Sequence, residues 1–296
     1  MITPMAVTNT ATIIIPGADE QTARAERRYR SPLRYPGGKQ KAIDQIAQLF
    51  PPSAREYREP LVGGASVFFH AKSKGFAEKY WINDKFSELH AFWKAVQNEE
   101  TCARLMRELE MLRRSFGDDA EKIKEYFLKA RAEKTPDRYR AAFLFFFFNR
   151  VTFSGTTRAG GFSSAASLRR FTASSIQRLA PMPEALSGVE ITNLDYELVI
   201  QKPGRGVFIF IDPPYFKASR LYGRGGILHE FDHVRLAKVL KETPKHRFLI
   251  TYDDCPEIRK LYRWANIQNW QLQYGMNNCN LKKESKIGSE LFISNY

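Results

Sequence analysis

The sequence predicts an α/β fold in which a mostly parallel sheet carries helices on both faces and is interrupted by a mainly helical insertion. Strand-like runs at 55–60 and 79–84 are each followed by helical patterning, which is typical of a parallel sheet. Charged, amphipathic helices replace this alternation from 99 to 183, and strand-like runs return from 188 onward. The apolar run at 207–211 is typical of a strand buried on both faces.

The individual elements are expected in the following order. The first strand leads through Gly63 and Gly64 into a short helix that ends near Gly75, and the second strand ends at Asp84 before a helix at 85–97. The later strands are expected within 188–195, 206–215, 246–254, 270–277 and 289–296, with helices at 232–242 and 256–265 between them.

Composition divides the chain into a flexible arm, a sheet domain and an insertion. Residues 1–28 are rich in Thr and Ala, which predicts a flexible N-terminal arm. The sheet domain is expected to comprise residues 29–98 and 184–296, and the insertion residues 99–183. Glycines within 216–230 predict a mobile loop beside the end of the fourth strand.

The chain carries a large positive charge. Its 46 Lys and Arg residues against 32 acidic residues give a net charge of +14, which favours a polyanionic partner such as nucleic acid or an acidic membrane surface. Residues 138–183 contain seven arginines but no lysine and no carboxylate. Because a solvated helix face normally mixes charges, this block favours phosphate contacts over a plain basic surface.

Cysteine content and hydropathy limit the class of protein further. The three cysteines lie far apart and support neither a disulfide framework nor a zinc site, so no metal is expected. The N-terminus lacks the pattern of a secretory signal. Ala141–Phe148 is uniformly apolar but too short to cross a membrane, so we expect a buried core helix there and a cytoplasmic protein.

The most specific motif is the run Asp212, Pro213, Pro214 and Tyr215. Two prolines must end the preceding strand, and ligands of parallel sheets bind beyond the carboxyl ends of strands. The Asp212 carboxylate and the Pro213 carbonyl are acceptors that can hold the two hydrogens of an exocyclic amine. Tyr215 offers a ring for stacking on a planar base. The alternative interpretation is a plain turn with a helix cap.

A second candidate site is the glycine turn after the first strand, where the amides of Gly63 and Gly64 can face a ligand. Asp84 ends the next strand, the position from which an acid binds ribose hydroxyls. Turn chemistry or a helix cap explains each feature alone, whereas together they favour a nucleoside-bearing cofactor. The segment 34–41 lacks the Ser or Thr of a phosphate loop, which argues against a nucleotide triphosphatase.

Five motifs in order, RYPGGKQK, EPLVGGASVF, IND, FNRVTFSG and IDPPYF, resemble the Dam-like family of adenine-specific DNA methyltransferases, in its alpha group. The resemblance runs from about Arg34 to the end of the chain. It implies a Rossmann-like methyltransferase sheet, an inserted DNA-recognition domain and S-adenosylmethionine as the methyl donor. The implied reaction methylates the exocyclic amino group of an adenine that has been flipped out of duplex DNA.

The resemblance and the arginine-rich insertion together nominate site residues. Tyr35 and Lys39 are implied at the methionine end of the cofactor, Asp84 at its ribose and Asp195 near its adenine. The full cofactor set is Tyr35, Lys39, Pro60, Gly63, Gly64, Asp84, Asp195 and Asp212, and the target adenine is expected at Asp212, Pro213, Pro214 and Tyr215. DNA contacts are expected from Asn149, Arg150, Phe153, Ser154, Arg158, Arg169 and Arg170, with core packing as the alternative for Phe153.

Two residues depart from the family pattern. The family usually has Phe where Leu61 stands and a second glycine where Ala65 stands. The extra methyl of Ala65 is expected to be tolerated provided that its backbone is not left-handed.

Other functions remain as alternatives from the sequence alone. These are methylation of RNA, methylation of a protein amide, and DNA binding by a catalytically inactive relative. A restriction endonuclease of the same system is a candidate partner, and the chain is expected to be a monomer, with a dimer as the alternative.

Overall fold

The computed structural model describes residues 29–134, 137–217, 231–243, 245–273 and 287–296. The arm predicted at 1–28 and most of the loop predicted at 216–230 lie outside the described residues.

A seven-stranded sheet forms the centre of the fold, with the strand order β3-β2-β1-β4-β5-β7-β6. β1 to β5 pair in parallel, and β7 runs antiparallel to both of its neighbours. The strands are β1 (Ala54–Glu59), β2 (Ala77–Asn83), β3 (Val189–Thr192), β4 (Val207–Ile211), β5 (Arg247–Asp253), β6 (Asn266–Gln273) and β7 (Ile287–Ser294).

Both faces of this sheet are buried, which explains the continuous apolar run of β4. Side chains of a strand alternate between faces. Phe208 and Phe210 join one hydrophobic core, while Val207, Ile209 and Ile211 join a second core on the other face.

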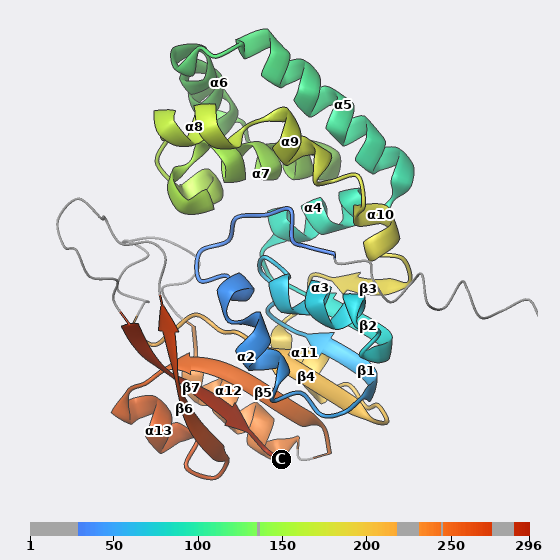
Figure 1. Cartoon of the computed structure of the whole chain (residues 1–296), viewed down its shortest axis with the longest axis vertical. Coiled ribbons are helices and arrows are strands. Elements are labelled where there is room, and N and C mark those ends of the chain that lie inside the picture. The colour runs from blue at the N-terminus through green and yellow to red at the C-terminus, as the bar shows by residue number, and fades with distance from the viewer. Residues whose placement is uncertain (1–28, 135–136, 218–230, 244, 274–286) are drawn as a thin grey trace, which may run out of the picture.

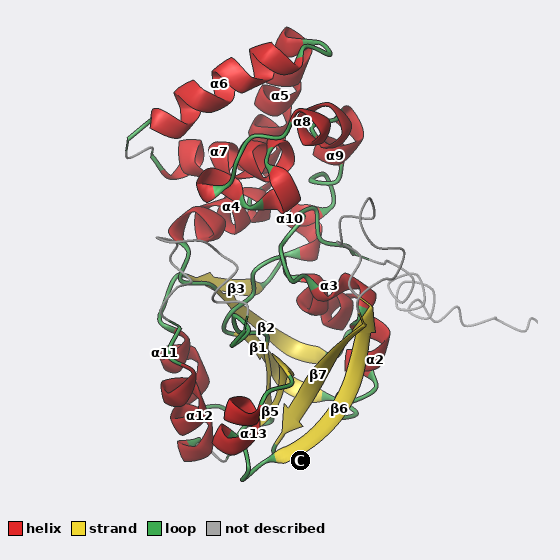
Figure 2. Ribbon diagram, turned by 90° about the vertical axis from the view of Figure 1, so that its left-hand side faces the viewer, coloured by secondary structure: helices red, strands yellow, loops and turns green. Residues whose placement is uncertain are grey.

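Helices cover both faces (Figure 2). The first face carries α2 (Ile43–Ala47), α3 (Ser66–Ser73) and α4 (Ser87–Gln97), after the short 3-10 helix η1 (Lys39–Lys41). The second face carries α11 (Tyr196–Gln201), α12 (His233–Glu242) and α13 (Pro256–Leu261). The predicted α/β class with a mostly parallel sheet is confirmed.

The helices between α4 and β3 gather at one end of the molecule (Figure 1). They are α5 (Glu99–Phe116), α6 (Ala120–Ala132), α7 (Arg138–Val151), α8 (Ser164–Arg170), α9 (Ala173–Gln177) and α10 (Met182–Ala185), with the 3-10 helices η2 (Phe153–Gly155) and η3 (Thr157–Ala159). The phenylalanines of α7 belong to the same core as the first face of the sheet. Because this core is continuous, the domain boundaries at 99 and 183 stay a prediction.

Candidate active site

The segment from Asp212 to Tyr215 follows β4 at the carboxyl edge of the sheet. The strand order reverses between β1 and β4, because β2 and β3 lie beyond β1 on one side and β5 lies beyond β4 on the other. Ligands of open α/β sheets bind at such a reversal. The motif therefore lies where the fold provides a ligand site.

Asp212 is the centre of a cluster of polar contacts. The Lys39 ammonium lies 2.7 and 2.8 Å from the two carboxylate oxygens of Asp212, and the Thr251 hydroxyl donates to Oδ1 at 2.6 Å. Lys39 Nζ also donates to the Gly37 carbonyl at 3.0 Å and lies 4.7 Å from the centroid of the Tyr215 ring. Lys39 is only 4% exposed, so these contacts compensate for the loss of water around its charge.

The predicted glycine turn lies beside this cluster, at the end of β1. Tyr35 packs directly on it, since a Cβ atom at Gly63 would stand 2.8 Å from Tyr35 Cε1 and one at Gly64 would stand 2.7 Å from Tyr35 Cβ. Gly63 also has a positive φ of 46°. Only glycine permits this approach, so Tyr35 and the turn form one surface.

The backbone of Ala65 is left-handed, which contradicts the condition under which we expected its extra methyl to be tolerated. It precedes α3 with φ 57° and ψ 24°, which is the left-handed region. An L-residue with a Cβ is disfavoured there by about 1–2 kcal/mol. The alanine is therefore strained at a position where the family usually has glycine.

Asp84 is tied to the glycine turn. Its Oδ2 accepts the Gly63 N–H at 2.9 Å and its Oδ1 accepts the Phe86 N–H at 3.0 Å. Burial raises the pKa of Asp84, although these backbone donors lower it in part. The predicted proximity of the turn and the acid at the end of the next strand is thus present in the structure.

Pro60 and Asp195 have scaffold contacts of their own. The Pro60 carbonyl accepts from the side-chain amide of Asn83 at 2.9 Å. Asp195 begins α11 by accepting the Glu197 N–H, and it pairs with Arg235 at 2.8 Å and Lys85 at 3.1 Å. Burial alone would raise the pKa of Asp195, but these donors lower it overall.

Sequence reasoning missed Glu59, the last residue of β1. Its carboxyl is buried and accepts the Tyr57 hydroxyl at 2.6 Å. Burial raises the pKa of Glu59 well above its ordinary value, and the charges of Asp212 and Asp84 raise it further. Its position directly before the glycine turn is the signal that could have identified it.

Three more side chains of the site were also missed. Thr251 and Asp253 on β5 and Glu290 on β7 all contact the segment from Asp212 to Phe216. The spacing of Thr251 and Asp253, two residues apart after a buried run, is the signal that could have found two of them.

Comparison with known proteins decides the family. Residues 35–276 match the family described as D12 class N6 adenine-specific DNA methyltransferase. The chain belongs to this family. The predicted enzyme class, a site-specific DNA methyltransferase that acts on adenine, is confirmed by this membership.

Individual relatives agree with the family. The chain is 28% identical over 288 residues to the type II methyltransferase M.MjaIII of Methanocaldococcus jannaschii, a match that covers 89% of this chain and 98% of that protein. It is 31% identical over 245 residues to the DNA N-6-adenine-methyltransferase of Escherichia phage P1, covering 79% of this chain and 31% of that protein. It is 26% identical over 254 residues to the DNA adenine methylase of Vibrio cholerae, covering 81% of this chain and 87% of that protein.

In this DNA adenine methyltransferase, two neighbouring residues at the end of α7 differ in role. Asn149 is fully buried, accepts the Arg34 N–H at 3.1 Å and donates to the Arg34 carbonyl. It therefore holds the Arg34 backbone and does not face solvent as a predicted DNA contact would. Arg150 is 2% exposed, and its Nε and Nη2 have no hydrogen-bond partner among the described residues.

Positive charges surround Arg150. Burial, together with the charges of Arg178, Arg34 and Arg170, lowers the pKa of Arg150 to about 9. The structure thus gathers four arginines, Arg34, Arg150, Arg170 and Arg178, which we call the arginine cluster. Such a concentration of like charges is stabilised by an anion.

Of the remaining predicted DNA residues, Arg169 and Phe153 are exposed, whereas Arg158 is hydrogen-bonded within the protein. Arg158 donates to the carbonyls of Arg131 and Glu133 at 3.2 and 2.9 Å, so it caps the end of α6. Phe153 is 65% exposed, which rules out core packing, and Ser154 beside it has a left-handed φ of 55°.

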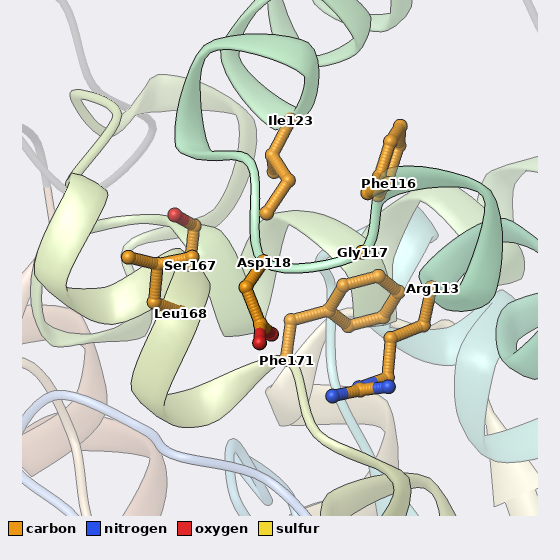
Figure 3. A pocket seen from close by; sticks show the side chains of 8 residues that line it. All are labelled: Arg113, Phe116, Gly117, Asp118, Ile123, Ser167, Leu168 and Phe171. Carbon is orange, nitrogen blue, oxygen red and sulfur yellow. The ribbon is translucent and has the colours of Figure 1, made fainter.

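Two hollows lie away from this site. The wider one, of about 470 Å³, lies at the amino ends of β1 and β2 and is lined by Arg55, Glu78 and Gly206 among others. The cavity in Figure 3 lies between α5, α6 and α8, is lined by Arg113, Asp118 and Phe171 among others, and holds about 10 Å³. That volume suits a single water molecule and not a nucleobase. Among the described residues, no helix is long and apolar enough to cross a membrane, and no cluster of metal-binding side chains is present.

Proposed function

We propose that the enzyme uses S-adenosylmethionine and flips its target adenine onto Asp212, Pro213 and Tyr215. The observation that carries the proposal is the convergence of Asp212, Tyr215 and the glycine turn with Asp84 at the reversal of strand order. When bound, S-adenosylmethionine supplies a methyl group on a positively charged sulfur.

The described residues fit such a cofactor. A carboxylate has about four acceptor sites, more than the backbone donors of Gly63, Lys85 and Phe86 use on Asp84, so Asp84 can also accept ribose hydroxyls. The Tyr35 ring and the bare backbone of the glycine turn offer a flat surface beside it. Asp195 and Pro60 are proposed to border the same surface.

The adenine amino group needs two hydrogen-bond acceptors, and the motif supplies a carboxylate and a backbone carbonyl. Its two N–H bonds would point to the Asp212 carboxylate and the Pro213 carbonyl, which turns the nitrogen lone pair toward the methyl donor. Both oxygens would stabilise the positive charge that develops on nitrogen, and the nitrogen would pass one proton to water as the methylated amine forms. Lys39 contacts both oxygens of Asp212 and Thr251 contacts Oδ1, which leaves acceptor capacity on Oδ2 for the adenine amino group.

DNA is proposed to lie across the helical end of the molecule. The arginine cluster is suited to phosphate, because an anion on the exposed Arg34 and Arg178 and the half-buried Arg170 would reduce their repulsion with the buried Arg150. Phe153 is suited to contact bases near the extruded adenine, as an exposed ring on a strained loop. Arg169 extends this basic surface. A restriction endonuclease partner and a monomeric state stay predictions.

A methyl-transfer assay tests the proposal. The full chain is incubated with methyl-labelled S-adenosylmethionine and, in parallel, unmodified bacterial DNA, RNA or protein, and the product nucleosides are identified by mass spectrometry. We expect N6-methyladenine in DNA alone, together with binding of S-adenosylmethionine by calorimetry. Label in RNA or protein alone, or no binding of the cofactor, would overturn the proposal.

A further inference from the structure

The segment that carries Asp212 and Tyr215 rests on polar side chains of β5 and β7. Thr251 and Asp253 are two residues apart on β5 and so share one face of the sheet. Glu290 lies directly opposite Asp253 in the antiparallel β5–β7 pair, so it points to the same face. All three side chains are buried.

Each of the three holds a different part of the segment. Thr251 donates its hydroxyl to Asp212 Oδ1 at 2.6 Å. Glu290 Oε2 accepts the Tyr215 hydroxyl at 2.6 Å. The two oxygens of Asp253 accept the backbone N–H groups of Phe216 at 2.8 Å and Lys217 at 2.9 Å. Asp212 and Tyr215, the two ends of the motif, are therefore both held by side chains of β5 and β7.

Burial of two carboxyl groups at one strand pair is costly unless hydrogen bonds repay it. Here the bonds go to the motif and not to the strand ladder, whose pairing is complete without them. A short phenol–carboxylate bond also holds the hydroxyl end of the Tyr215 ring in place, and it favours one ring plane because a phenol O–H prefers to lie in the plane of its ring. The stacking surface for a base is thus oriented before the base arrives.

We propose that Thr251, Asp253 and Glu290 are positioning residues that fix the Asp212 carboxylate and the Tyr215 ring for the incoming adenine. This inference rests on the proposed function and extends its site from the motif into β5 and β7. The competing explanation is that the three residues only stabilise the fold.

A double-mutant cycle separates these explanations, using the full chain, S-adenosylmethionine and unmodified bacterial DNA. Glu290→Leu should lower kcat between about tenfold and a hundredfold, with KM for S-adenosylmethionine changed less than about twofold. Glu290→Gln should stay close to wild type, because its amide oxygen still accepts from Tyr215. In a Tyr215→Phe background, Glu290→Leu should have little further effect, since the hydrogen bond is already absent.

The controls keep the outcomes distinct. Glu190→Gln changes an exposed acid on β3 and should leave kcat unchanged. If Glu290→Leu does not fold, Thr251→Val and Thr251→Ser test the same idea at Asp212, with a loss of kcat expected for Val and rescue for Ser. Glu290→Leu could lower kcat equally in the wild-type and Tyr215→Phe backgrounds, or Glu290→Leu and Thr251→Val could both keep the wild-type kcat. Either result would overturn this inference and leave the proposed function standing. A wild-type protein that makes no N6-methyladenine would overturn the proposed function and this inference with it.

Discussion

Single residues of this site combine strain, burial and shared acceptors. Asp212 is contacted by Lys39 and Thr251, Asp84 is tied to the glycine turn, and Glu59 carries a carboxyl in a buried position between them. Such features reduce stability and are typical of functional sites. The strained backbone of Ala65 and the buried carboxyl of Glu59 have measurable consequences for the free energy of unfolding.

Ala65→Gly should stabilise the protein by up to about 1 kcal/mol, because glycine adopts the left-handed backbone without a steric penalty. Urea unfolding measures the change. Ala91→Gly, inside the right-handed helix α4, is the matched control and should lose about 1 kcal/mol. Equal losses at both positions would show that Ala65 is not strained.

Glu59→Gln should gain stability relative to wild type as pH rises above about 4.5. The raised pKa means that the folded protein holds the Glu59 proton more tightly than the unfolded chain does. Wild-type stability therefore falls as pH rises from the unfolded pKa toward the folded one, and glutamine lacks this loss. Urea unfolding at several pH values measures the difference, with Glu190→Gln as the control. A difference that does not vary with pH would contradict the burial of a neutral Glu59.

At the scale of elements, most strands were predictable, although β6 begins at Asn266 and not at Trp270 as predicted. Of the short helices, α3 and α13 were predicted, but α11 and α2 were not. β4 could be located because a buried parallel strand is apolar at every position and must stop at two prolines. α11 was missed because it has six residues and its capping residue, Asp195, was assigned to the cofactor instead. α2 was missed because it is only five residues long and follows a turn rich in glycine and proline.

The loop after α7 yields a prediction about Phe153. Phe153→Ala should leave the free energy of unfolding within about 0.5 kcal/mol of wild type, because the ring is mostly exposed. It should lower the rate of DNA methylation, since the loop loses the ring proposed to contact bases. Met111→Ala, at another exposed apolar residue, should change neither quantity. Undiminished methylation by the Phe153 variant would remove this ring from the DNA interface.

Across the whole molecule, the fold joins residues that the sequence leaves far apart. The resemblance implied that the glycine turn and Asp212 both contact the cofactor, and in the structure both follow parallel strands at one edge of the sheet. No pattern predicted that Lys39 would reach Asp212 or that Asn149 would hold Arg34. Such contacts depend on tertiary packing. The sequence nominated Arg150 and Arg170 and included Arg178 in its arginine-rich block, while only the structure added Arg34.

Salt dependence tests the arginine cluster. Arg170→Ala should weaken DNA binding and reduce the slope of log affinity against log salt by about one for each lost phosphate contact. Lys238→Ala, an exposed cation on α12, is the control and should leave the slope nearly unchanged. An unchanged slope in the Arg170 variant would remove the cluster from the interface.

The most direct test of the central claim is the formation of N6-methyladenine by Asp212→Ala. Unmodified bacterial DNA is incubated with S-adenosylmethionine and either wild-type or variant protein, and the nucleosides are quantified by mass spectrometry. The variant should bind DNA about as tightly as wild type, because the phosphate contacts lie elsewhere, but should form almost no N6-methyladenine. Methylation by Asp212→Ala at the wild-type rate would contradict the claim that this carboxylate orients the adenine amino group.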